Sequence, residues 1–100
     1  MNKKTAAPQE EGSRQFSHLH NTSIYAQQAR LLCALIDGSV TTYQAREQLN
    51  ICAPAARIIE LREQGHDILT SFETLPDGAG RLHPRSARYV LLALAPEVIQ

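Results

Sequence analysis

Three stretches between residues 23 and 64 place apolar side chains at helical spacing. The first covers residues 24–37, with Ser23 as its candidate N-cap and Gly38 as its candidate C-cap. One apolar face on such a helix is typical of a globular domain, in which that face covers the core. The predicted face consists of Ile24, Gln28, Leu31, Leu32, Leu35 and Ile36.

A short β-branched segment, SVTT, separates the first helix from the second. Val40 is expected to form a brief strand, and either Thr41 or Thr42 to cap the helix that follows. The sequence TYQAREQLN then predicts a second, shorter helix. Ala45 and Leu49 fall on its inner face.

The third helix is predicted from Pro54 to about Gln64. Asn50 is suited to a left-handed residue that ends the second helix, and a three-residue corner leads to Pro54. Proline at the first helical position loses no hydrogen bond, and Gly65 stands just past the end. These signals predict a helix-turn-helix unit with a short connection.

After Gly65 the apolar period falls from a helical value to two. Residues 67–75 alternate as a strand does, residues 76–80 (PDGAG) have the composition of a turn, and residues 87–94 form a second β-rich run. The expected fold is therefore α+β: three helices followed by a C-terminal β-hairpin, which is the winged helix-turn-helix arrangement.

One hundred residues, 43% of them hydrophobic, are enough for a single core. Residues 1–22 hold almost no large apolar side chains, so we expect a flexible polar tail there. The domain is predicted over 23–95, with a C-terminal tail over 96–100. No stretch is apolar enough to suggest a membrane partner or a secretion signal, and we expect a cytoplasmic protein.

Candidate chemistry is sparse. Cys33 lies in the apolar run of the first helix and is expected in the core, and Cys52 stands near the start of the third helix, without metal-ligand spacing between them. There is no phosphate-binding glycine loop, nucleophile elbow or paired carboxylate face. We therefore expect no enzyme activity, no metal site and no cofactor.

The stretch VTTYQAREQLNICAPAARIIELREQGHDILTSFET resembles the small winged helix-turn-helix domains common in bacteriophage and prophage proteins. The resemblance covers about residues 24–92 and includes Arg88-Tyr89 before the last apolar run. It implies double-stranded DNA as the partner and the third helix as the reader. The family often carries serine directly before the proline of this helix, where this chain has Ala53, a poor cap.

A helical wheel divides the third helix into two sides. The predicted core side holds Pro54, Ala55, Ile58, Leu61 and the stem of Arg62. The predicted outer side holds Ala53, Ala56, Arg57, Glu60 and Gln64.

On that outer side, Ala53 and Ala56 are small enough for the helix backbone to approach base edges closely, with their methyl groups against thymine. Arg57 is a long donor for guanine or phosphate. The alternative is that Arg57 forms a surface ion pair with Glu60 or Glu47.

Phosphate contacts are expected from the second helix. Its candidates are Thr42, Tyr43 and Arg46, near the helix start, where free N–H groups favour an anion. The alternative for Tyr43 is a half-buried position against the first helix.

The predicted hairpin adds local positive charge. Between Asp77 and Glu97 the chain has no acid, while Arg81 and Arg85 lie nearest the turn and suit phosphate or the minor groove. Arg88, within the strand, is an alternative partner for Glu73 across the hairpin.

Two functions follow as hypotheses. The first is a DNA-binding transcriptional regulator or recombination accessory factor, which reads the major groove with helix 54–64 and the backbone or minor groove with the basic hairpin. The second is a winged-helix protein-interaction module, such as an anti-repressor or assembly adaptor, which suits the formal net charge of zero. A homodimer through residues 91–99 is a further expectation, because apolar side chains continue there beyond what the second strand needs.

Overall fold

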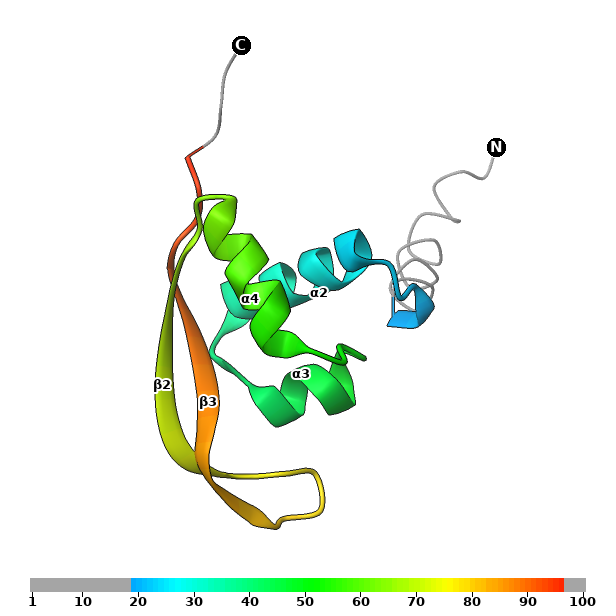
Figure 1. Cartoon of the computed structure of the whole chain (residues 1–100), viewed down its shortest axis with the longest axis vertical. Helices are drawn as coiled ribbons and strands as arrows, with labels where there is room; N and C mark the ends of the chain where they lie inside the picture. Colours follow the sequence, from blue (N-terminus) through cyan, green and yellow to red (C-terminus); the bar gives the residue numbers. More distant parts are fainter. Residues whose placement is uncertain (1–18, 97–100) are drawn as a thin grey trace, which may run out of the picture.

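Within residues 19–96, which a computed structural model describes, the protein has three helices and one antiparallel sheet (Figure 1). The predicted α+β winged helix-turn-helix fold is confirmed. The elements are α2 (Ile24–Asp37), β1 (Val40–Thr41), α3 (Thr42–Gln48), α4 (Pro54–Glu63), β2 (Asp67–Pro76) and β3 (Leu82–Ala93).

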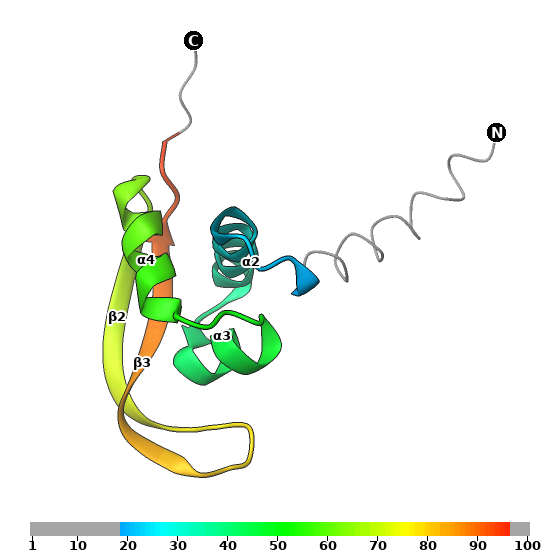
Figure 2. The same ribbon diagram turned by 45° about the vertical axis from the view of Figure 1, so that its right-hand side comes forward.

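β3 is the central strand of the sheet, with β1 on one side and β2 on the other. Both pairings are antiparallel, so that Tyr89 of β3 lies opposite Val40 and also opposite Thr70. Figures 1 and 2 show the helices on one side of the β2–β3 hairpin, whose loop curves beneath α3. We call the hairpin the wing and residues 77–81 the wing loop.

Local sequence signals set the ends of the first two helices. The Ser23 hydroxyl accepts from the Ala26 amide at 3.1 Å. Thr41 and Gln44 form a reciprocal capping box at the start of α3, with bonds of 3.1 and 2.9 Å. Asn50 has a φ of 55°, the left-handed conformation expected after α3. These predicted boundaries are confirmed.

The core lies where α2, α3 and α4 meet the sheet. Each helix contributes residues to it, and Ile51 contributes from the connection between α3 and α4. Its fully buried large side chains are Leu31, Ile51, Ile58 and Leu61, and around them pack Leu35, Val40, Ala45, Ile68 and Tyr89.

The buried face of α2 differs from the predicted one. Ile24 and Ile36 are 51% and 56% exposed, and Cys33 is exposed rather than in the core. Gln27 and Arg30 are buried in their place. The expectation was wrong because polar side chains were assigned to solvent, whereas here they bind polar atoms of neighbouring segments.

Arg30 shows why a charged side chain is buried in α2. Its Nε donates to the carbonyl oxygen of Leu49 at 2.7 Å, its Nη2 to that of Asn50 at 3.1 Å, and its Nη1 to that of Asn21 at 2.7 Å. One guanidinium thus joins α2 to the end of α3. Asn21 belongs to the predicted tail, so this contact extends beyond the expected start of the domain; residues 1–18 lie outside the described part.

The second strand of the wing begins earlier than predicted, at Leu82 rather than at about residue 87, and it ends at Ala93. Ala93 is still paired with β2, and Leu91 packs against the core, so these residues do not outrun the strand as expected. The Ala95 amide then donates to Nδ1 of His66 at 2.9 Å. The last described residues are therefore attached to the turn between α4 and β2.

Candidate nucleic-acid interface

Arg57, the predicted base-reading residue, is engaged inside the domain. Its Nε and Nη2 donate to the two carboxylate oxygens of Glu60 at 2.7 and 2.9 Å, and its Nη1 donates to Gln27 of α2 at 3.4 Å. Only 12% of the Arg57 side chain is exposed. The ion pair with Glu60, the alternative to DNA contact, is the arrangement that the structure contains.

Gln28 of α2 extends this contact along α4. Its Nε2 donates to Glu60 at 2.9 Å, and its side-chain oxygen accepts from Gln64 at 3.0 Å. The hydrogen bond from Arg57 and then that from Gln28 lower the pKa of Glu60 below its ordinary value. Much of the predicted outer side of α4 therefore faces α2.

The exposed strip of α4 is rotated by about one residue from the predicted one. Ala55, expected in the core, is exposed, and Ile59 one turn later is 54% exposed. Ala53 is also exposed, Ala56 is half-buried, and Glu63 continues the exposed strip to the end of the helix. The error arose because Arg57 and Glu60, which are half-buried, were taken as solvent-facing from their polarity; Gln64 is exposed as expected.

The N-terminus of α4 has no side-chain cap. Ala53 occupies the cap position and accepts only through its carbonyl, from Ala56 at 3.1 Å and Arg57 at 3.4 Å. Pro54 is at the first helical position, as expected.

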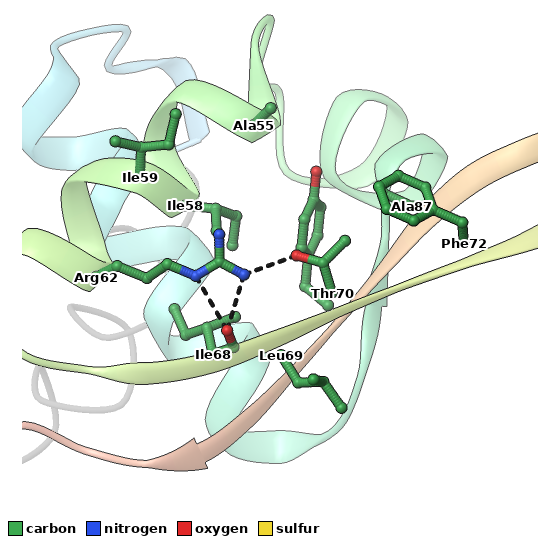
Figure 3. Close-up of a pocket in the computed structure, with 10 residues that line it drawn as sticks. Ala55, Ile58, Ile59, Arg62, Ile68, Leu69, Thr70, Phe72 and Ala87 are labelled. Carbon is green, nitrogen blue, oxygen red and sulfur yellow. Dashed lines mark hydrogen bonds between the residues drawn. The ribbon is translucent and has the colours of Figure 1, made fainter.

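Arg62 closes one side of the space between α4 and β2. Its Nε and Nη2 donate to the carbonyl of Ile68 at 3.0 and 2.8 Å, and Nη2 also donates to the Thr70 hydroxyl at 2.7 Å (Figure 3). These contacts hold the Arg62 guanidinium against β2, although the residue as a whole is exposed.

An apolar groove of about 490 Å³ lies between α4 and β2 (Figure 3). Its rim holds two large exposed side chains, Ile59 at 54% and Phe72 at 70%, whereas the Leu69 side chain points away from it (Figure 3). Tyr89 lines it from β3. The groove gives α4 and the wing one continuous, mostly apolar surface.

The start of α3 is joined to the wing. The Thr42 hydroxyl donates to the Ala87 carbonyl at 3.4 Å. Tyr43 is half-buried, with its ring centroid 4.8 Å from that of His83 and its hydroxyl 3.4 Å from the Ser86 hydroxyl. These contacts with the wing differ from the position against the first helix that was the alternative for Tyr43.

Asp77 organises the wing loop. One carboxylate oxygen accepts from the amides of Ala79 and Arg81 at 2.9 and 3.0 Å, and the other lies 2.8 Å from Nε2 of His83. These hydrogen bonds, that of His83 first, lower the pKa of Asp77. The loop is therefore held in shape by the one acid at its base.

Three candidate arginines reach solvent. Arg46 on α3, Arg81 at the wing loop and Arg85 on β3 are exposed, and their side chains make no hydrogen bond or ion pair within the part of the chain that the structure describes. Arg85 has a φ of 55°, a conformation uncommon for a residue with a side chain. These are the cations that a phosphate could contact.

Arg88 differs from these three arginines. Its Nε lies 3.1 Å from Glu73 across the hairpin, and its Nη1 donates to Ser39 at 2.9 Å. The predicted pair with Glu73 is confirmed. The hydrogen bond from Ser71 and then that from Arg88 lower the pKa of Glu73.

Among residues 19–96 no cluster of His, Cys, Asp and Glu has metal-binding geometry, and no helix is long and apolar enough to cross a bilayer. Cys33 and Cys52 are exposed free thiols.

Comparison with protein families places this geometry in a known group. Residues 26–93, more than half of the chain, match a family described as a winged helix-turn-helix domain. Searches of curated proteins and of solved structures find no match. With its helix-turn-helix unit α3–α4 followed by a β-hairpin, the chain belongs to the winged helix-turn-helix domain family.

Proposed function

We propose that the protein binds double-stranded DNA in the cytoplasm, as a transcriptional regulator or recombination accessory factor of the phage or prophage type. The supporting observation is the set of three exposed arginines, Arg46, Arg81 and Arg85, on the two elements that flank α4 in this fold. In a winged helix-turn-helix domain, α4 enters the major groove while its neighbours contact the backbone.

The net charge of zero is compatible with this proposal because the charges are unevenly placed. From residue 78 to residue 96 the chain has three arginines and no acid. The carboxylate of Asp77, directly before this segment, is hydrogen-bonded to His83 and to two amides of the wing loop. Arg88 is paired with Glu73, so Arg81 and Arg85 are the exposed charges of the wing that have no partner among the described residues. Local unpaired charge of this kind favours phosphate contact even when the net charge is zero.

Arg81 and Arg85 are proposed to hold phosphate or the minor groove, and Arg46 to hold phosphate beside α3. Thr42 and Tyr43 are less favourable phosphate ligands than their sequence positions suggest, because both are bonded to the wing. Ala53 and Ala56 keep the proposed role of allowing close approach of α4.

A protein-interaction module is the second candidate. It is favoured by the apolar groove, whose rim side chains Ile59 and Phe72 are large and exposed. Contiguous exposed apolar surface often marks an interface with protein.

Salt dependence of binding to a random-sequence duplex tests the first candidate. Phosphate contacts make the logarithm of affinity fall linearly with the logarithm of salt concentration. The double variant Arg81→Ala/Arg85→Ala should reduce that slope by about one unit for each lost phosphate contact. Arg88→Ala is the matched control, because Arg88 is already paired and should leave the slope unchanged. Absence of any duplex binding by the wild-type chain would favour the second candidate.

A homodimer through the C-terminal residues remains a proposal. Leu92 and Leu94 are 57% and 51% exposed, whereas residues 98 and 99, also part of the expected interface, lie outside the described residues. Sedimentation of the wild-type chain and of Leu92→Glu/Leu94→Glu at high micromolar concentration would decide: a dimer that the variant lacks supports the interface, and a wild-type monomer contradicts it.

A further inference from the structure

The long hydrogen-bond donors of α4 are all used within the domain. Arg57 donates to Glu60 and Gln27, Arg62 to Ile68 and Thr70, and Gln64 to Gln28. Guanine is usually read by an arginine or lysine, and adenine by an asparagine or glutamine. Over Pro54–Glu63 and its C-cap, only Nη1 of Arg62 is left without a partner among the described residues, and Arg62 could offer guanine two donors only by breaking its contacts with β2.

What the first two turns of α4 expose instead is apolar. Ala53 and Ala55 present methyl groups at the start of the helix, and Ile59 presents a branched chain, 54% exposed, one turn beyond Ala55. Ala55 and Ile59 are four residues apart and therefore lie on one face. The surface that would enter a groove is a short aliphatic strip.

Only one base offers an apolar partner to such a strip. In the major groove, thymine carries the C5 methyl group, while the other base edges present donors and acceptors. The small side chains at 53 and 55 let the backbone come close, and Ile59 can then cover a methyl group.

Charge argues for DNA rather than a protein as the occupant of this strip. Arg46 of α3 and Arg81 and Arg85 of the wing are exposed and lie on the elements to either side of α4 in the chain. Glu63 is the acid on the exposed strip and stands at its last turn, away from the helix start. The wing loop that carries Arg81 lies against α3 (Figure 1), so these cations suit phosphate groups beside the exposed start of α4.

We propose that α4 recognises its DNA site through thymine methyl groups, with Ile59 as the main specificity-determining residue and Ala55 as its neighbour. This inference rests on the proposed DNA-binding function. It replaces Arg57 with an aliphatic side chain as the reader of the major groove.

The experiment begins with selection of the preferred duplex from a random pool by the full chain. Each thymine of that duplex is then replaced by uracil, which lacks the methyl group and keeps the same donors and acceptors. Loss of a buried methyl contact of about 0.8 kcal/mol corresponds to about a fourfold loss of affinity. We expect this loss at one or two positions, and none at the others.

Variants connect the effect to the proposed side chains. Ile59→Ala should bind the thymine and uracil duplexes nearly equally, because a side chain that ends at Cβ is too short at this position to cover the thymine methyl group. Arg81→Ala is the matched control: it should weaken both duplexes and preserve their ratio. Ile59→Val provides a second variant with less change to packing, for which the ratio should be intermediate.

Three results would overturn the inference. The first is a selected duplex whose affinity is unchanged by uracil but is weakened when 7-deazaguanine removes guanine N7. The protein would then still bind DNA, but through a polar side chain that contacts guanine. The second is unchanged discrimination in folded Ile59→Ala, with folding checked by circular dichroism. The third is the absence of any duplex binding by the wild-type chain, which would remove the proposed function itself.

Discussion

Nε2 of His83 lies 2.8 Å from Oδ2 of Asp77, so the two ends of the wing loop are joined across it. The same imidazole ring packs on Tyr43 of α3, with 4.8 Å between centroids and 33° between ring planes. Gly78 lies against the carboxylate of Glu47, also on α3. The wing loop is therefore fastened both to itself and to the helix-turn-helix unit.

His83→Ala should release this fastening. We expect faster hydrogen exchange at the amides of Ala79 and Arg81, because both donate to an Asp77 carboxylate that His83 now holds in place. DNA affinity should fall several-fold as Arg81 loses its fixed position, while the unfolding midpoint changes little. The measurements are amide exchange by NMR and duplex titration.

Tyr43→Phe is the control for the wing loop. It keeps the ring that His83 packs on and removes only the hydroxyl, whose distance to Ser86 is 3.4 Å. Its exchange rates should resemble those of the wild type. Unaltered exchange at both amides in His83→Ala would contradict a fastening role for the imidazole.

Arg57→Ala should reduce the stability of the fold and leave the choice of DNA base unchanged. The guanidinium is bound to Glu60 and Gln27, and its side chain is only 12% exposed. We expect the free energy of unfolding to fall by about 1.5 kcal/mol, the lower end of the range for hydrogen bonds to charged groups, because the Glu60 carboxylate is partly exposed. Chemical denaturation measures this change, and Glu60→Gln should be non-additive with it. If the variant is as stable as the wild type but discriminates less against other bases at a guanine position, Arg57 contacts that guanine after all.

Arg30→Met should destabilise the domain more strongly, by about 2–4 kcal/mol, because several carbonyls lose their donor in a buried place. The affected carbonyls are those of Asn21, Leu49 and Asn50. Urea unfolding gives the size of the loss. Arg30→Lys, which keeps the charge but not the forked donors, should recover only part of it. Full recovery by lysine would mean that charge rather than geometry matters.

The domain should lose stability in acid. The pKa values of Glu60, Glu73 and Asp77 are all lowered in the folded protein, by hydrogen bonds to their carboxylates. Below an unfolded-state pKa of about 4 the unfolded chain binds more protons, so stability present at neutral pH is lost progressively as pH falls through the folded values. The combined variant Glu60→Gln/Glu73→Gln/Asp77→Asn should show a shallower fall of unfolding midpoint between pH 5 and roughly pH 2. An equally steep fall would place the acid-sensitive groups elsewhere.

Sequence patterns predicted the elements of this fold well because local chemistry determines where they end. Thr41 caps α3 with its own hydroxyl, Asn50 takes the left-handed conformation that stops it, and Pro54 begins α4. Each of these signals depends on residues within four positions of the boundary. The boundaries of these helices could therefore be predicted without knowledge of the tertiary structure.

The faces of the helices were harder to predict. Gln27, Arg30 and Arg57 are polar, and a wheel assigns polar residues to solvent. In the fold they bind the atoms of a neighbouring helix or turn, and this contact orients α4. The two partners of such a contact are distant in sequence, as Arg30 and Leu49 are, so no local sequence pattern predicts the contact.

The wing was predicted as a hairpin but not as a bent one. The contact of His83 with Tyr43 joins residues forty positions apart, and nothing near either residue indicates it. Asp77 gave a partial signal, since an aspartate followed by glycine favours a turn. The sequence therefore located the basic residues of the wing but not the side of the domain on which its loop is held.

Arg30 donates to main-chain oxygens of Asn21, Leu49 and Asn50, and these three hydrogen bonds do not depend on the side chains of their acceptors. A carbonyl is present whatever side chain its residue carries. Substitutions at 21, for example, can change surface chemistry without removing a bond to the guanidinium. New recognition sequences could thus be grafted beside α4 while a residue in a different helix preserves the angle at which α4 is presented.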